Sequence, residues 1–135
     1  MAAVRAELER GRLATEIVAA YLEARREMRR ASIDTVVERL RESGSPLRVE
    51  EVHSLEEARR LGRAVVRTLV FMPGDTRCLR RSLVLMKLLA KRGIPARLVI
   101  GARAGPDFLA HAWVEHGGEP VLPPGDGSFG RLVEL

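Results

Sequence analysis

Cysteine is nearly absent from this sequence, and long apolar runs are absent altogether. Cys78 is the only cysteine among 135 residues, which excludes an intrachain disulfide and a metal site built from several cysteines. No stretch approaches the ~18–20 apolar residues that span a bilayer. The first residues alternate charged with apolar side chains, unlike the apolar core of a signal peptide. We therefore expect a cytoplasmic protein with no membrane partner, no metal and no other cofactor.

Basic residues exceed acidic ones only slightly, and the two signs are interleaved. The net charge is +5, from 23 basic and 18 acidic residues. The densest basic run, from Arg25 to Arg30, has one aromatic neighbour, Tyr21, and is typical of a solvated helix face. We therefore expect no nucleic-acid partner.

Helical patterns fill the first part of the chain. The apolar content of 46% is sufficient for a single packed domain, 1–135. Apolar residues recur at helical spacing over residues 13–28 and 33–40. Ser54, with Glu57 three residues later, matches a capping box and predicts a third helix that begins there. We therefore divide the domain into a helical part, 1–53, and a core, 54–135.

The segment Arg77–Lys91 is predicted to be the central helix of the core. Its apolar residues occupy most sides, as in a helix packed inside a domain. A glycine, Gly93, follows it as a stop signal. Strand patterns come next, separated by turns at 105–107 and 117–118. The predicted strands cover residues 97–100, 109–116, 121–122 and 129–135. This order predicts an α+β fold in which helices come first and the central helix packs on a small antiparallel sheet.

Cys78 lies in the first turn of the predicted central helix. Unpaired backbone amides and the positive end of the helix dipole favour a thiolate there. A lone cysteine is also commonly an inert, small apolar residue. His111 strengthens the catalytic interpretation, because an imidazole in reach of a thiol is what nucleophilic catalysis requires. A single strand histidine is otherwise often structural, and His53 and His116 are expected at the surface.

A third residue is needed to orient the imidazole. On the strand 109–116, the side chains of His111, Trp113 and Glu115 share one face. Glu115 is ~13 Å along the strand from His111, which is too far to bond its ring. Asp126 follows the neighbouring strand and is our choice, with Asp107 as the alternative. Trp113 is expected to wall the site, or else to fill core.

Three segments, taken together, resemble one known family. They are Cys78-Leu79-Arg80-Arg81-Ser82-Leu83-Val84-Leu85, Arg92-Gly93-Ile94-Pro95-Ala96-Arg97-Leu98-Val99-Ile100-Gly101 and Ala110-His111-Ala112-Trp113-Val114-Glu115. The family is that of the lasso-peptide leader peptidases, the protease half of split lasso maturation proteins, with a transglutaminase-like, papain-related fold. The segments occur in the family's order and spacing, and the similarity covers about residues 60 to 125.

The resemblance implies a cysteine peptidase that cuts a ribosomally made precursor between leader and core. Its implied partners are that precursor peptide, a separate leader-recognition protein and an ATP-using lasso cyclase. Cys78 takes the place of the nucleophile and His111 that of the base. Separately from the resemblance, we expect Trp113 and Leu79 to form the substrate and oxyanion wall. The family's acid usually lies near the position held here by Pro123, and this sequence offers Asp126 slightly later.

Two other functions fit the same residues. An acyltransferase would use the same Cys–His pair on a different amine acceptor. A subunit without catalysis would only hold a leader peptide or a nucleic acid, and the joint occurrence of Cys78 and His111 in specific segments is the sequence feature against it.

Overall fold

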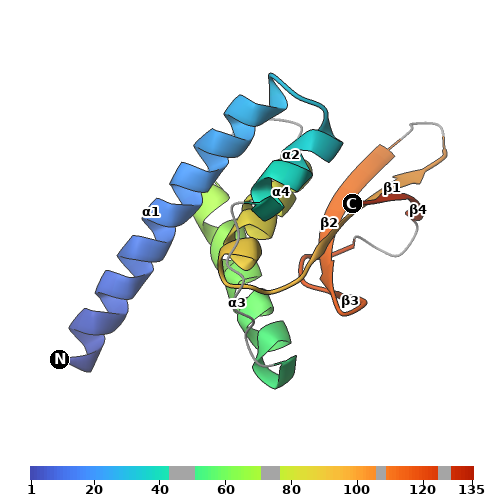
Figure 1. The fold of residues 1–135 in the computed structure, drawn as a ribbon. Helices are drawn as coiled ribbons and strands as arrows, with labels where there is room; N and C mark the ends of the chain where they lie inside the picture. The colour runs from blue at the N-terminus through green and yellow to red at the C-terminus, as the bar shows by residue number, and fades with distance from the viewer. Residues whose placement is uncertain (43–50, 71–76, 106–108, 125–128) are drawn as a thin grey trace.

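The protein consists of a layer of helices packed against one side of a small sheet (Figure 1). The computed structural model describes residues 1–42, 51–70, 77–105, 109–124 and 129–135. The helices are α1 (Ala2–Met28), α2 (Ile33–Glu42), α3 (Glu51–Leu69) and α4 (Arg77–Lys91). The strands are β1 (Arg97–Arg103), β2 (Leu109–His116), β3 (Glu119–Pro120) and β4 (Gly130–Glu134). The predicted α+β class is confirmed.

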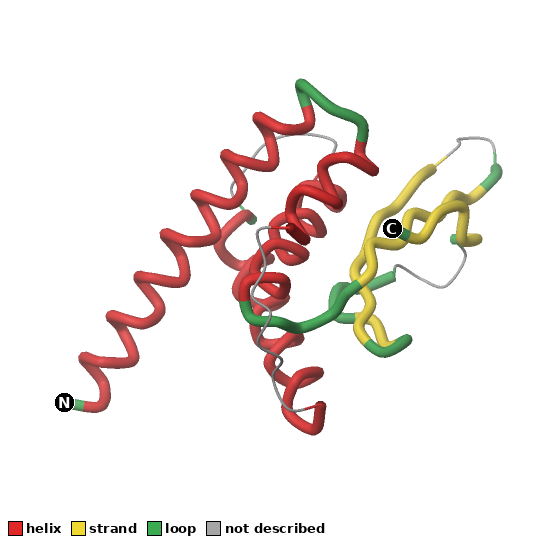
Figure 2. Tube along the Cα trace, in the orientation of Figure 1, coloured by secondary structure: helices red, strands yellow, loops and turns green. Residues whose placement is uncertain are grey.

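Helix α4 forms the centre of the core. It contacts α1, α2 and α3 and, on its other side, β1 and β2 (Figure 2). Its bounds agree with the predicted ones. The apolar residues of α4 that are at most 2% exposed are Leu83, Val84, Leu85, Met86, Leu88 and Leu89. The apolar residues on most sides of this helix are therefore explained by neighbours on most sides.

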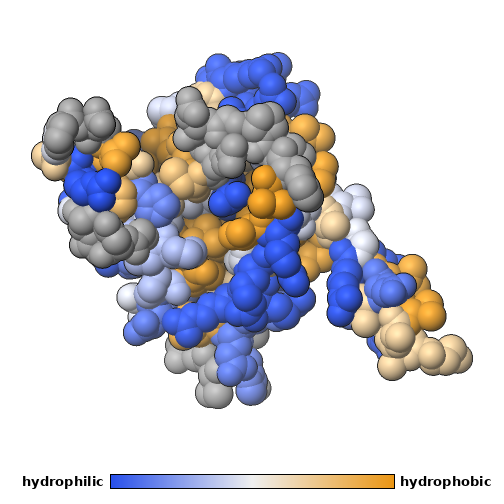
Figure 3. Space-filling model, turned by 180° about the vertical axis from the view of Figure 1, so that it is seen from behind, coloured by the Kyte–Doolittle hydropathy of each residue, from blue (hydrophilic) through white to orange (hydrophobic). Residues whose placement is uncertain are grey.

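Helix α1 packs on the core only through its second half. Ile17, Ala20 and Ala24 are buried there, one helical turn apart, whereas residues 1–12 are exposed. The exposed half stands apart from the body of the protein (Figures 1 and 3). Glu16 accepts two hydrogen bonds from Arg92, just beyond α4, and this guanidinium lowers the pKa of the Glu16 carboxyl.

Helix α3 begins earlier than the sequence indicates, and the predicted capping box is wrong. The helix starts at Glu51, so Ser54 lies inside it and is 3% exposed. Its hydroxyl lies 2.7 Å from Nε2 of His116. The other ring nitrogen, Nδ1, bonds to the carbonyl oxygen of Pro95. His116 is therefore a link between sheet and helices and not the free surface residue we expected, whereas His53 is exposed.

The sheet is antiparallel in the order β3-β2-β1-β4. Gly117 and Gly118 form the turn between β2 and β3, with φ angles of 59° and 81° that favour glycine. The short strand predicted at 121–122 is wrong, because β3 lies at Glu119–Pro120. The amides of Val121 and Leu122 both point to the carbonyl of Val114, while their side chains are buried.

Candidate active site

The chain topology brings Cys78 and His111 to the same end of the protein. His116, at the end of β2, bonds to Pro95, four residues after the end of α4. Cys78 is about 20 Å back along α4 from Lys91, and His111 is about 17 Å back along β2 from His116. Because β2 runs parallel to α4, the first turn of α4 and the beginning of β2 lie toward the same end of the domain (Figure 1).

Cys78 occupies the first turn of α4, as predicted. It is partly exposed and partly packed on the apolar core. Its backbone carbonyl accepts a hydrogen bond of 2.7 Å from Oγ of the buried Ser82, one turn later. Leu79 is also partly buried against the core. Cys78 is thus a partly exposed residue in the first turn of a helix, a position at which reactive cysteines occur.

His111 is in contact with two aromatic rings and one backbone carbonyl. The ring stacks on Trp113, with centroids 5.8 Å apart and an interplanar angle of 24°. Phe129, next to β4, lies on the ring at a centroid distance of 5.3 Å. Nε2 lies 2.8 Å from the carbonyl oxygen of Pro123. In the part of the chain that the structure describes, no hydrogen bond joins His111 to Cys78.

His111, Trp113 and Glu115 share one face of β2, as predicted. The indole Nε1 of Trp113 donates to Oε2 of Glu115 at 2.9 Å. This face is opposite to the one on which His116 reaches α3, because side chains alternate along a strand. Gly101, opposite His111 on β1, leaves the space for Trp113: a Cβ there would lie 3.0 Å from the indole ring. Trp113 is 3% exposed.

A charged cluster continues this face away from His111. Glu115 is 8% exposed and receives two hydrogen bonds from Arg131 of β4, at 3.1 and 2.7 Å. Arg131 also donates to Glu134, and hydrogen bonds to Glu134 and Glu115 raise the pKa of Arg131. Glu115 makes no bond to the imidazole, in agreement with the distance estimated from the sequence. The Glu115 carboxylate instead accepts the hydrogen bonds of the Trp113 indole and the Arg131 guanidinium.

The acidic residues considered as the third member of the site are not among those that the structure describes. Asp126 and Asp107 both lie outside the described residues, so their assignment stays a prediction. Pro123 and Phe129, which do touch the ring, were not predicted as site residues. A backbone carbonyl carries no sequence signal, because every residue type has one. Phe129 is one of only three phenylalanines. The rarity of this residue type was the only feature of the sequence that could have drawn attention to it.

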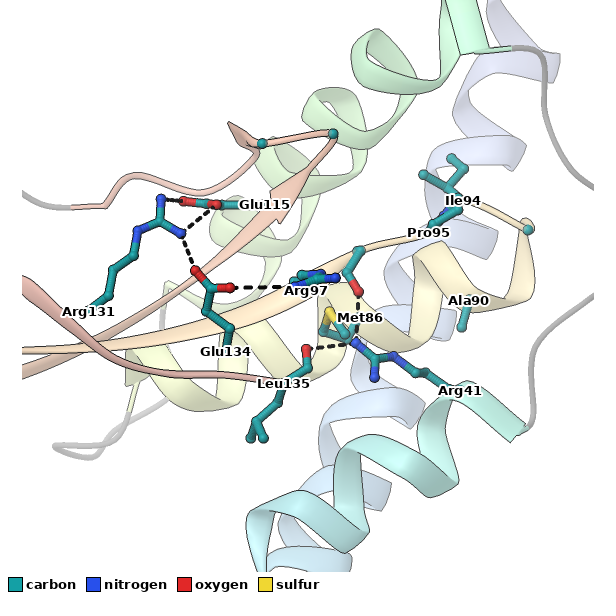
Figure 4. A pocket seen from close by; sticks show the side chains of 14 residues that line it. Arg41, Met86, Ala90, Ile94, Pro95, Arg97, Glu115, Arg131, Glu134 and Leu135 are labelled. Carbon is teal, nitrogen blue, oxygen red and sulfur yellow. Dashed lines mark hydrogen bonds and ion pairs between the residues drawn. The ribbon is translucent and has the colours of Figure 1, made fainter.

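A broad cleft of about 1300 Å³ lies at the other end of the sheet (Figure 4). It is formed where α4 ends, β1 begins and β2 ends, with Met86, Ala90 and Arg97 in its wall. Arg41 of α2 crosses this region and donates to the carbonyls of Ala96 and Leu135. Cys78 and His111 do not line this cleft. We therefore assign the candidate active site to the residues at the beginning of α4 and not to this cleft.

Among the residues that the structure describes, no group of three or more histidine, cysteine or acidic side chains is arranged to hold a metal ion. None of the described helices is both long enough and apolar enough to cross a membrane.

Comparison with known proteins agrees with this architecture. The sequence profile of the Transglutaminase-like superfamily matches residues 2–134. The chain therefore belongs to the transglutaminase-like superfamily, and the match includes the N-terminal helices as well as the segment that carries Cys78 and His111. Searches of curated proteins and of solved structures found no match.

Proposed function

We propose that the protein is a cysteine peptidase that removes the leader peptide from a lasso-peptide precursor. The observation that carries the proposal is the position of Cys78, in the first turn of the central helix of a transglutaminase-like domain. His111 lies at the same end of the domain, on β2. The segments around both residues resemble the lasso-peptide leader peptidases, and this resemblance supports the choice of substrate.

The proposed reaction uses two steps. His111 accepts the thiol proton of Cys78, and the thiolate attacks the carbonyl carbon of the last leader residue. Backbone amides at the start of α4 stabilise the oxyanion. His111 then protonates the core amine as the peptide bond breaks, which leaves a thioester between leader and Cys78. Water, deprotonated by His111, hydrolyses the thioester and releases the leader acid.

The proposal includes partners and a compartment. The precursor is made by ribosomes, so the enzyme would act in the cytoplasm. A separate leader-recognition protein would present the precursor, because the described helices and strands of this chain form one layered body without a second peptide-binding unit. A lasso cyclase would then use the freed amine of the core.

The test is cleavage of a synthetic precursor, with and without the leader-recognition protein, followed by mass spectrometry of the products. We expect separate leader and core peptides from the wild-type protein, faster with the recognition protein present. Cys78→Ala should reduce the rate to background while circular dichroism stays unchanged. His53→Gln, on the exposed face of α3, is the matched control. Cleavage by Cys78→Ala at the wild-type rate would refute the proposal.

An acyltransferase is the second candidate, because membership of the superfamily fits a Cys–His enzyme of either kind. It differs only in what resolves the thioester. Adding a primary amine to the same assay distinguishes the two. A free leader acid as the main product supports the peptidase, and a leader amide formed at low amine concentration supports the acyltransferase.

A further inference from the structure

The ring of His111 has one nitrogen that is already engaged. Nε2 lies 2.8 Å from the carbonyl oxygen of Pro123, in the segment that follows β3. A carbonyl oxygen only accepts hydrogen bonds, so Nε2 must carry the hydrogen. In the neutral imidazole the second nitrogen, Nδ1, is then unprotonated and has a free lone pair. The contact therefore selects one of the two tautomers and leaves Nδ1 as the basic atom.

The chain around the acceptor is unusually constrained. Pro123 has its φ angle fixed by its own ring. Pro124 follows directly and restricts the ψ angle of Pro123 to extended values. Both angles that aim the Pro123 carbonyl are therefore limited by covalent structure. The preceding residues, Val121 and Leu122, anchor the segment because their side chains are buried and their amides point to the Val114 carbonyl.

The ring itself is in contact with two aromatic side chains. Trp113 stacks on it at 5.8 Å, and Phe129 lies against it at 5.3 Å. Trp113 is in turn held by its hydrogen bond to Glu115. These contacts limit rotation of the imidazole, so that the hydrogen bond to Pro123 decides which nitrogen is presented for chemistry.

We propose that the carbonyl of Pro123 is the positioning group of His111, in place of a side-chain carboxylate. It holds the neutral ring with hydrogen on Nε2, so that Nδ1 is the atom that takes the thiol proton of Cys78. This inference rests on the proposed catalytic role of His111. It differs from the assignment of Asp126 made on the sequence, and the two assignments predict different results for one variant.

The direct test is nitrogen-15 NMR of the histidine rings, which needs no substrate. Long-range proton–nitrogen correlations distinguish a protonated from an unprotonated ring nitrogen. The chain has three histidines, and His111→Gln identifies the signals of His111. We expect His111, at a pH where it is neutral, to carry its hydrogen on Nε2 in the wild-type protein. A ring with hydrogen on Nδ1 would overturn the proposal.

The variant Asp126→Asn tests whether His111 is positioned by the Pro123 carbonyl or by the Asp126 carboxylate. We expect the Nε2–H tautomer to persist in this variant and kcat to fall by less than about tenfold. A triad carboxylate replaced by its amide costs ~10⁴ in rate when it sets the tautomer. A change of tautomer together with a loss of that size would show that Asp126 positions the ring, and would overturn the proposal while leaving the Cys–His peptidase intact.

The complementary test gives the backbone that carries the Pro123 carbonyl more conformational freedom. The double variant Pro123→Gly, Pro124→Ala keeps the carbonyl but frees both of its torsions. We expect mixed tautomers of His111 and a fall in kcat of ~10-fold or more, with KM little changed. Pro120→Ala, in β3, removes a proline from the same segment without touching the ring and is the control. A double variant that kept a single Nε2–H tautomer and full kcat would contradict the positioning role.

Discussion

At the residue scale, Trp113 lies between the His111 ring and the Glu115–Arg131 ion pair on one face of the sheet. Its ring supports His111, and its indole N–H is satisfied by Glu115. Glu115 is a buried carboxylate, which is costly unless it is paired and hydrogen-bonded. Arg131 supplies the charge and two hydrogen bonds. The position of the imidazole is therefore linked, through one aromatic ring, to an ion pair about 13 Å further along β2.

Glu115→Gln should destabilise the fold. A glutamine can still accept the hydrogen bond of the Trp113 indole, but it loses the ion pair and the two hydrogen bonds with Arg131. We expect the free energy of unfolding to fall by about 1–3 kcal/mol, measured by urea denaturation. The control is Glu134→Gln, an exposed partner of the same arginine, for which about 0–1 kcal/mol is expected. Equal losses in the two variants would mean that burial of Glu115 contributes nothing.

At the element scale, α3 and the segment after β3 fit together through a glycine. A Cβ atom on Gly62 would lie 2.9 Å from the backbone carbonyl oxygen of Val121. Val121 and Leu122 are the residues that lead to Pro123, so this close packing fixes the segment that carries the acceptor of His111. Gly11 in α1 is a helical glycine in open space, since a Cβ added to it would meet no neighbouring atom within 4 Å.

The two glycines give opposite predictions for the same substitution. Alanine in a helix interior is intrinsically better than glycine by about 1 kcal/mol. Gly11→Ala should therefore raise the free energy of unfolding by up to about 1 kcal/mol. Gly62→Ala should lower it by about 1–3 kcal/mol, because the added methyl group collides with backbone. Thermal and urea unfolding measure both, and a Gly62→Ala protein as stable as Gly11→Ala would contradict the packing described here.

Sequence patterns identified the elements better than they identified their partners. The bounds of α4 and β2 were predicted correctly, because a helix apolar on most sides and a strand ending at a glycine pair are strong local signals. Ser54 was misassigned as a cap, since its true partner, His116, is 62 residues away. The contact between His111 and Pro123 could not be predicted either. It depends on tertiary packing, and its acceptor is a backbone atom.

At the scale of the whole molecule, the helical first part and the sheet are joined by specific contacts. Glu16 of α1 binds Arg92 beyond the end of α4, and Glu23 of α1 forms an ion pair with Lys87 within α4. Arg41 of α2 reaches the backbone of Ala96, just before β1, and of Leu135, just after β4. The family match over residues 2–134 includes all of these elements. We infer that the N-terminal helices support the second half of α4 and the strands that follow it.

The measurement that tests the central claim most directly is the alkylation rate of Cys78 by iodoacetamide. If Cys78 and His111 act as a nucleophilic pair, removing the imidazole must slow the thiol at neutral pH. We predict that His111→Gln lowers the rate constant by ~10-fold or more, whereas His53→Gln leaves it unchanged. The chain has a single cysteine, so intact-mass spectrometry reports this one site. Equal alkylation rates in the wild-type protein and in folded His111→Gln would contradict the account.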